Sequence, residues 1–85
     1  MAKVEVYSSA HCPYCVMAKQ LLDRKGVVYT EISVDLDPSK RQLMMKKSRQ
    51  RTVPQIFIND ESIGGYTDLV AINNSKRLDN LLSQS

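Results

Sequence analysis

The first third of the chain contains two hydrophobic patterns with different periods. From Lys3 to Tyr7, apolar and polar residues alternate, which predicts a short strand. Beyond a loop, apolar residues recur at helical offsets on one stripe formed by Cys15, Ala18, Leu21 and Leu22. We therefore expect a helix that begins at Cys12, has Pro13 as its first helical residue and stops at Gly26.

The next two segments continue the alternation of strands and helices. Val27 to Ser33 is rich in β-branched residues and predicts a second strand. A strand, a helix and another strand within the first 33 residues are typical of a right-handed parallel crossover. A second helix is expected to open at Asp37-Pro38-Ser39 and to run to about Gln50.

The C-terminal part predicts a hairpin followed by helices. Gln55 to Ile58 is the third strand, Asn59-Asp60 the turn and Glu61 to Ile63 the fourth strand. Gly64-Gly65 then breaks the chain.

Two capping signals mark the helices after this break. Thr67 or Asp68 is expected to cap the first of them, and Ser75 can cap the last. The buried stripe of the last helix is predicted to be Leu78, Leu81 and Leu82. The whole order is βαβ, then α, then ββ, then α. It indicates an α/β fold with a small, mixed, four-stranded sheet and helices on both faces.

The length and composition limit the class of protein. Eighty-five residues leave room for one compact domain, 1–85, and exclude a two-domain dehydrogenase, a kinase or a large barrel. The apolar fraction of 42% and the charged fraction of 25% are those of an ordinary globular domain. No apolar run approaches the roughly 20 residues of a membrane helix. The N-terminus lacks the apolar core of a signal peptide, so we expect a soluble cytoplasmic protein.

The positive charge is concentrated in one segment. The net charge is +3, and half of the twelve cations lie within residues 40–51, where there is no acid. This cluster consists of Lys40, Arg41, Lys46, Lys47, Arg49 and Arg51. It fits a solvated helix face or the attraction of a small anionic ligand. Nucleic acid is the least favoured partner, because no aromatic residue interleaves the cluster to stack on bases.

The two cysteines carry the strongest chemical signal. Cys12-Pro13-Tyr14-Cys15 is a C-x-x-C motif within a predicted βαβ unit, which is typical of a dithiol redox site. At a helix start, residues three apart lie on one face, so the two sulfurs can meet. Cys12 sits where free N–H groups and the helix dipole favour a thiolate. Cys15 lies on the apolar stripe, so we expect Cys12 to attack and Cys15 to resolve the mixed disulfide.

Two other interpretations of the cysteines are weaker. A structural disulfide over four residues would remove little chain entropy, roughly 2 kcal/mol before strain is subtracted. A zinc site needs four ligands, and the only other soft donors are His11 and four methionines. We therefore expect no metal.

Three segments together make the chain resemble a dithiol glutaredoxin of the thioredoxin-like fold family. They are Cys12-Pro13-Tyr14-Cys15, Thr52-Val53-Pro54 and Gly64-Gly65-Tyr66-Thr67-Asp68, in the family's order. The C-x-x-C motif alone is shared by many thioredoxin-like proteins, but the three segments together are specific. The match covers nearly the whole chain.

The resemblance implies a glutathione site around these segments. Pro54 should be cis, which leaves the backbone groups of Val53 free to pair with an extended peptide. The α-carboxylate of the γ-glutamyl residue should dock on the N–H groups of Thr67 and Asp68, with Gly65 allowing its close approach. The Asp68 side chain should meet the ammonium group of the same residue.

The resemblance also implies further residues of the site. Tyr14 and Thr52 should line the glutathione groove, whereas the role of Tyr66 stays open. Arg51 and Lys47 could reach the glycyl carboxylate of glutathione and rank below the contacts just named.

One departure from the family concerns the residues before Cys12. Many members carry a lysine there, but Ser8-Ser9-Ala10-His11 holds none. Either the helix dipole and the basic cluster suffice, or His11 contributes when it is protonated.

The resemblance also implies the function. We expect a monomeric, glutathione-dependent thiol–disulfide oxidoreductase that reduces glutathione mixed disulfides by a monothiol route and protein disulfides by a dithiol route. Its partners would be glutathione and oxidised proteins, and ribonucleotide reductase is a common client of the family. Two alternatives are a redoxin reduced by thioredoxin reductase and a carrier of a glutathione-ligated 2Fe–2S cluster. Pro13 stiffens the motif and Cys15 competes for Cys12, which disfavours the cluster carrier.

Overall fold

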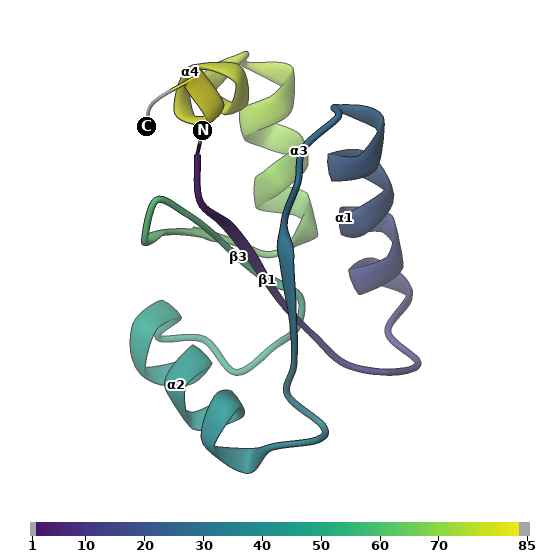
Figure 1. The fold of residues 1–85 in the computed structure, drawn as a ribbon, viewed down its shortest axis with the longest axis vertical. Coiled ribbons are helices and arrows are strands. Elements are labelled where there is room, and N and C mark those ends of the chain that lie inside the picture. The colour runs from purple at the N-terminus through teal and green to yellow at the C-terminus, as the bar shows by residue number, and fades with distance from the viewer. Residues whose placement is uncertain (1, 84–85) are drawn as a thin grey trace.

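The computed structural model describes residues 2–83 and shows one four-stranded sheet with four helices (Figure 1). The elements in chain order are β1 (Val4–Ser8), α1 (Pro13–Arg24), β2 (Thr30–Ser33), α2 (Pro38–Ser48), β3 (Gln55–Ile58), β4 (Glu61–Gly64), α3 (Tyr66–Asn74) and α4 (Arg77–Ser83). Within these residues, no helix has the length and apolarity needed to cross a membrane.

The sheet has the mixed pairing that the pattern predicted. Its strand order is β2-β1-β3-β4. β1 pairs with β2 in parallel, as expected for a strand–helix–strand crossover, and with β3 in antiparallel orientation. β3 and β4 form the predicted hairpin, and Asn59 and Asp60 at its turn both have a positive φ (53° and 67°).

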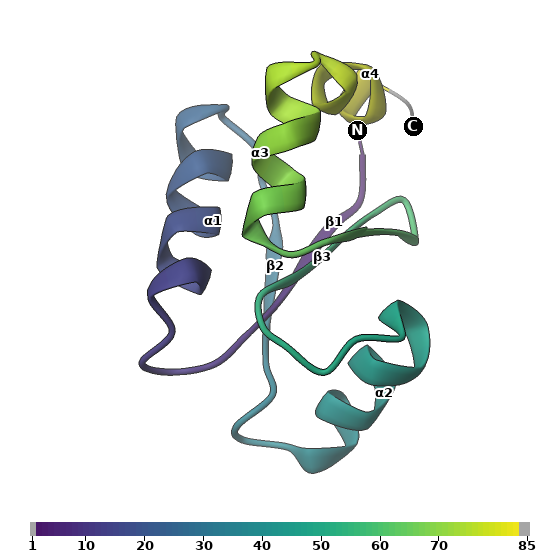
Figure 2. The ribbon, with the colours of Figure 1, turned by 180° about the vertical axis from the view of Figure 1, so that it is seen from behind.

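Helices cover both faces of the sheet, which confirms the predicted layers. One apolar cluster joins α1, α3 and α4 to the side chains of Val6 and Ile56 on the central strands. A smaller cluster on the other face joins α2 to Tyr7 and Phe57 through Met44. Figure 2 shows α2 on the opposite side of the strands from α1 and α3. β3 contributes to both clusters, and all four of its residues are buried.

β2 is shorter than predicted because the end of α1 holds the preceding residues. Gly26 has a φ of 71°, and its N–H donates to the Asp23 carbonyl at 3.0 Å. The N–H of Val27 donates to the Leu22 carbonyl at 3.0 Å. These two bonds form a Schellman motif. Its hydrogen bonds hold Val27 to α1, Val28 is 75% exposed, and pairing with β1 begins only at Thr30.

Helix boundaries in the second half also differ from the prediction. α2 ends at Ser48, because Arg49 takes a left-handed conformation with φ 61°. Gly65, not Thr67 or Asp68, is the N-cap of α3. Asp68 still caps this helix, but from its third position, where its carboxylate accepts the Gly65 N–H at 2.9 Å.

The last boundary follows the prediction more closely. The hydroxyl of Ser75 accepts the N–H of Arg77 at 3.4 Å, as expected of a residue before the last helix. Ser75 is also the C-cap of α3. Leu78 and Leu81 are buried in α4 as predicted, and Leu82 is partly buried.

Candidate active site

Cys12 is the N-cap of α1, directly before Pro13. Its backbone is extended (φ −112°, ψ 101°), and its Sγ accepts the N–H of Cys15 at 3.2 Å. The Cys12 thiol also donates to the Val53 carbonyl at 3.7 Å, across the gap between α1 and the start of β3. One N–H of the first turn, that of Cys15, therefore points at this sulfur, as expected of a reactive cysteine at a helix start.

Cys15 lies beneath, in the apolar core. It is only 1% exposed, whereas Cys12 is partly exposed, and both cysteines are free. Burial, together with the hydrogen bond to Cys12, raises the pKa of the Cys15 thiol to about 12. The N–H of Ser9 and the charge of Lys19 act in the opposite direction and lower this pKa less. Cys15 is therefore a neutral thiol at physiological pH.

We predict that alkylation at pH 7 labels Cys12 first. A thiol with a pKa of about 12 is a thiolate in only about one molecule in 10⁵ at that pH, and its burial restricts access as well. Mass spectrometry of the reduced protein after brief iodoacetamide treatment should show label on Cys12 alone, and Cys12→Ser should take up almost none. Faster labelling of Cys15 would contradict the assignment.

The loop before Cys12 is anchored by the acidic side chain of Asp35, which lies just after β2. The Asp35 carboxylate accepts the N–H of Ala10 at 2.7 Å and the hydroxyl of Ser9 at 2.9 Å. These bonds, with the nearby charge of Arg41, hold the pKa of Asp35 below its usual value. A lowered carboxyl pKa means that the anchor is fully present above about pH 4 and is lost as the pH falls. The next residue, His11, has a left-handed backbone (φ 59°).

A groove of about 380 Å³ opens beside Cys12. It is lined by Tyr14, Gln50, Thr52, Val53, Pro54, Gly65, Tyr66, Thr67 and Asp68. Seven of these residues are among the expected contacts, so segments far apart in the sequence do come together. The Val53–Pro54 peptide is cis, as the resemblance implied.

The groove also contains two residues that sequence analysis did not assign to it. Tyr66 was left open, and its ring stacks on that of Tyr14 with the centroids 6.0 Å apart. Gln50 was missed, because nothing in the sequence distinguishes it from the other polar residues of its segment. The sequence did offer one signal for Tyr66, because it is an aromatic residue directly after Gly65.

The two cationic candidates lie outside the set of lining residues. Arg51 is exposed and directly precedes Thr52. The ammonium group of Lys47 lies 4.6 Å from the centroid of the Phe57 ring and 4.0 Å from the Glu5 carboxylate. Its charge is therefore directed at the sheet in this conformation.

Gly64 lies behind the groove and packs closely against Asp68, one of the lining residues. It is buried, has a φ of 113°, and a Cβ at this position would collide with the Asp68 carboxylate. Gly65 has an ordinary φ of −90°, and a Cβ there would make only a van der Waals contact, 3.5 Å from the Pro54 carbonyl oxygen. Of the two glycines, Gly64 is thus the one whose missing side chain the backbone requires.

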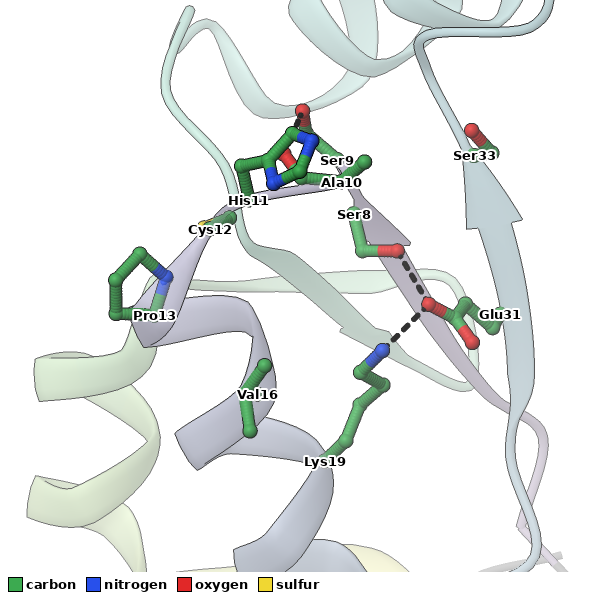
Figure 3. Close-up of a pocket in the computed structure, with 10 residues that line it drawn as sticks. All are labelled: Ser8, Ser9, Ala10, His11, Cys12, Pro13, Val16, Lys19, Glu31 and Ser33. Carbon is green, nitrogen blue, oxygen red and sulfur yellow. Dashed lines mark hydrogen bonds and ion pairs between the residues drawn. The ribbon is translucent and has the colours of Figure 1, made fainter.

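A second pocket, of about 510 Å³, reaches the loop that holds Cys12 (Figure 3). Figure 3 shows a chain of polar contacts across three elements in it. The ammonium group of Lys19 on α1 and the hydroxyl of Ser8 on β1 both lie 2.7 Å from the Glu31 carboxylate of β2. These contacts lower the pKa of Glu31, and the hydrogen bond raises that of Lys19.

Comparison with known proteins agrees with the geometry. The glutaredoxin family model matches residues 4–63. Glutaredoxin 3 of Escherichia coli (strain K12) is 49% identical over 82 residues, which cover 96% of this chain and 99% of that protein. A glutaredoxin of Pseudomonas aeruginosa is 47% identical over 83 residues and covers 98% of this chain and 99% of its own.

Solved structures show the same architecture. The solution structure of a glutaredoxin from Brucella melitensis superposes with a TM-score of 0.85 at 43% identity, covering 96% of this chain and 89% of the other. A crystal structure of a buckwheat glutaredoxin–glutathione complex gives a TM-score of 0.90 at 28% identity, covering 98% and 78%. The fold is thus thioredoxin-like, with a C-x-x-C motif at the start of α1. The chain belongs to the glutaredoxin family of glutathione-dependent thiol–disulfide oxidoreductases.

Proposed function

We propose that Cys12 is the nucleophile of this glutaredoxin and Cys15 its resolving thiol. The observation that carries this assignment is the difference between the two sulfurs. Cys12 is partly exposed, caps α1 and adjoins the groove, whereas Cys15 is buried with its pKa raised to about 12. Only a thiolate that is accessible to solvent can attack an incoming disulfide.

The groove is proposed to bind glutathione in extended form. The free N–H groups of Thr67 and Asp68 at the start of α3 are suited to the γ-glutamyl α-carboxylate. The Asp68 carboxylate accepts the Gly65 N–H, and it can meet the ammonium group of the ligand at the same time. The backbone of Val53 would pair with the cysteinyl residue, while Tyr14 forms part of the wall. The buckwheat relative was solved as a glutathione complex, which supports this ligand.

Arg51 and Lys47 remain our candidates for the glycyl carboxylate. Arg51 is the simpler choice, because it is exposed and lies in the sequence between Gln50 and Thr52, which both line the groove. Lys47 would first have to leave Glu5 and the Phe57 ring.

The monothiol route needs only Cys12. Its thiolate attacks the glutathione sulfur of a mixed disulfide, the S–S bond breaks, and the protein sulfur leaves with the electron pair and takes up a proton. A second glutathione thiolate then attacks the glutathione sulfur bound to Cys12. Glutathione disulfide leaves, and the Cys12 thiolate is restored.

The dithiol route adds Cys15. Cys12 attacks a protein disulfide, and the sulfur of Cys15 gives up its proton as it displaces the substrate thiol from Cys12. The Cys12–Cys15 disulfide that results is reduced by two glutathione molecules, which leave as glutathione disulfide. The clients would be oxidised proteins of the cytoplasm, where glutathione keeps thiols reduced, with ribonucleotide reductase as one family client to test.

Glutathione as the reductant is tested directly with two coupled assays. With NADPH, glutathione reductase and glutathione, the protein should turn over a glutathionylated peptide. With NADPH and thioredoxin reductase alone, the rate should equal the background. In an NMR titration with reduced glutathione, amide shifts should be confined to residues near 12–14, 50–54 and 64–68. Turnover supported only by thioredoxin reductase, or shifts elsewhere, would contradict the proposal.

A further inference from the structure

Gln55 is a polar side chain buried at the end of the groove wall. It is the first residue of β3, directly after Pro54, and it is 0% exposed. Among the described residues, Ser8 is the only other buried residue that carries a hydroxyl, amide or charge and is not aromatic. A glutamine amide is costly to bury unless its hydrogen bonds are made.

Within the described residues, the amide group of Gln55 bonds only to the segment that forms one wall of the groove. Its Nε2 donates to the Thr52 carbonyl at 3.0 Å and to the Oε1 of Gln50 at 3.1 Å, with the Thr52 hydroxyl at 3.4 Å. Gln50 and Thr52 both line the groove. Because Nε2 carries two N–H groups, the two shorter contacts use its full donor capacity.

The carbonyl oxygen of the same amide makes no hydrogen bond within the described residues. This atom, Oε1 of Gln55, is buried. The desolvation of this atom is therefore an uncompensated cost. An apolar side chain of the same size would fill the space without that cost, so packing alone does not account for a glutamine at this position.

Residues 49–52 connect the end of α2 to the residues before β3, and the Gln55 amide attaches this segment to the sheet. After α2 the chain turns through the left-handed Arg49, and the N–H of Gln50 bonds to the hydroxyl of Ser48. This bond joins the segment to the end of α2 on one face of the sheet. Figure 2 shows the segment as the teal trace that runs from α2 to the start of β3. The Gln55 amide ties the same segment to the central strand.

We infer that Gln55 is a positioning residue for the ligand groove. Its hydrogen bonds fix the positions of Gln50 and Thr52. Because Val53 follows Thr52, they also fix the position of the Val53 backbone. The inference rests on the proposed function, because it assumes that glutathione occupies this groove. Gln55 itself does not line the groove, and its effect is expected on binding and not on the sulfur chemistry of Cys12.

The test compares Gln55→Met with Ile56→Val. Methionine has nearly the shape of glutamine but donates no hydrogen bond. Ile56 is equally buried on the same strand, but it packs in the cluster with α1 and α3, away from the 49–52 segment. For a glutathionylated peptide, we expect Gln55→Met to raise KM about fivefold to tenfold and to change kcat less than about twofold, as the loss of one or two hydrogen bonds implies. Ile56→Val should leave KM unchanged, and both variants should keep the wild-type rate of Cys12 alkylation by iodoacetamide.

A second variant keeps the test decisive if Gln55→Met folds poorly. Gln50 is exposed, so Gln50→Ala should fold and raise KM by a smaller factor. In a double-mutant cycle, Gln50→Ala should have less effect in the Gln55→Met background than in the wild type. Additive effects, or an unchanged KM for Gln55→Met in a protein that binds glutathione, would overturn the inference alone. Failure of the wild-type protein to bind glutathione would overturn the proposed function instead.

Discussion

Cys12→Ser is expected to abolish turnover with every substrate, whereas Cys15→Ser should keep one of the two activities. Serine is a weak nucleophile at neutral pH without an adjacent base, and it cannot form a disulfide. We expect Cys12→Ser to lower the rate at least about 10³-fold with a glutathionylated peptide and with a disulfide-bonded protein. The rates of both reactions can be measured in assays coupled to glutathione and glutathione reductase.

Cys15→Ser should separate the two routes. The monothiol route uses only Cys12, so reduction of the glutathionylated peptide should continue at a rate within a few-fold of the wild type. Reduction of a protein disulfide should stop at a mixed disulfide that gel analysis without reductant can detect. Serine keeps the backbone N–H that donates to the Cys12 sulfur at 3.2 Å, so the helix cap is preserved. If instead Cys12→Ser stays active and Cys15→Ser does not, the roles are reversed.

Apart from the cysteine substitutions, Gly64→Ala is expected to be the most damaging single change next to the groove. With φ at 113°, an alanine strains the backbone, which costs on the order of 1–3 kcal/mol. Its Cβ would also displace the Asp68 carboxylate, whose hydrogen bond to the Gly65 N–H at 2.9 Å would be lost. A lost cap costs about 1 kcal/mol more. We therefore expect roughly 2–4 kcal/mol of destabilisation in urea unfolding, together with weaker glutathione binding.

Gly26→Ala is the matched control for this change. Gly26 also has a positive φ, of 71°, but a Cβ there would have no neighbour within 4 Å. It should lose only about 1 kcal/mol from the left-handed conformation and leave glutathione binding unaffected. If both variants lose the same stability and Gly64→Ala binds glutathione normally, the close approach of Gly64 to Asp68 has no functional role.

The predictions from sequence that succeeded rest on local signals. Three local signals specify α1, namely Pro13 at its start, the apolar stripe through Cys15 and Gly26 after its end, and the structure confirms each of them. The start of β2 was wrong because β-propensity takes no account of the Schellman motif, which holds Val27 to α1. The N-cap of α3 was wrong for a related reason. Gly65 has no capping side chain, and the Asp68 carboxylate performs the capping from inside the helix.

The cysteine pair was predictable from its own motif, but the groove was predictable only where the resemblance supplied it. Periodicity alone would not place Thr52 and Thr67 in one groove, because they belong to segments on either side of a hairpin. The resemblance brought these segments together but gave no role to Gln50 or Gln55. Their importance depends on a contact between a turn and the buried start of a strand, and such a contact has no sequence period.

The position of β3 at the centre of both apolar clusters has a consequence for hydrogen–deuterium exchange. Its residues Ile56, Phe57 and Ile58 are at most 1% exposed, so their amide protons should exchange only through global unfolding. The edge strand β2 and the short helix α4 can open locally at a lower free-energy cost. One wall of the groove, residues 52–54, directly precedes β3, so slow deuterium uptake should extend close to the ligand site. Bound glutathione should then raise the protection of the whole central strand by mass action.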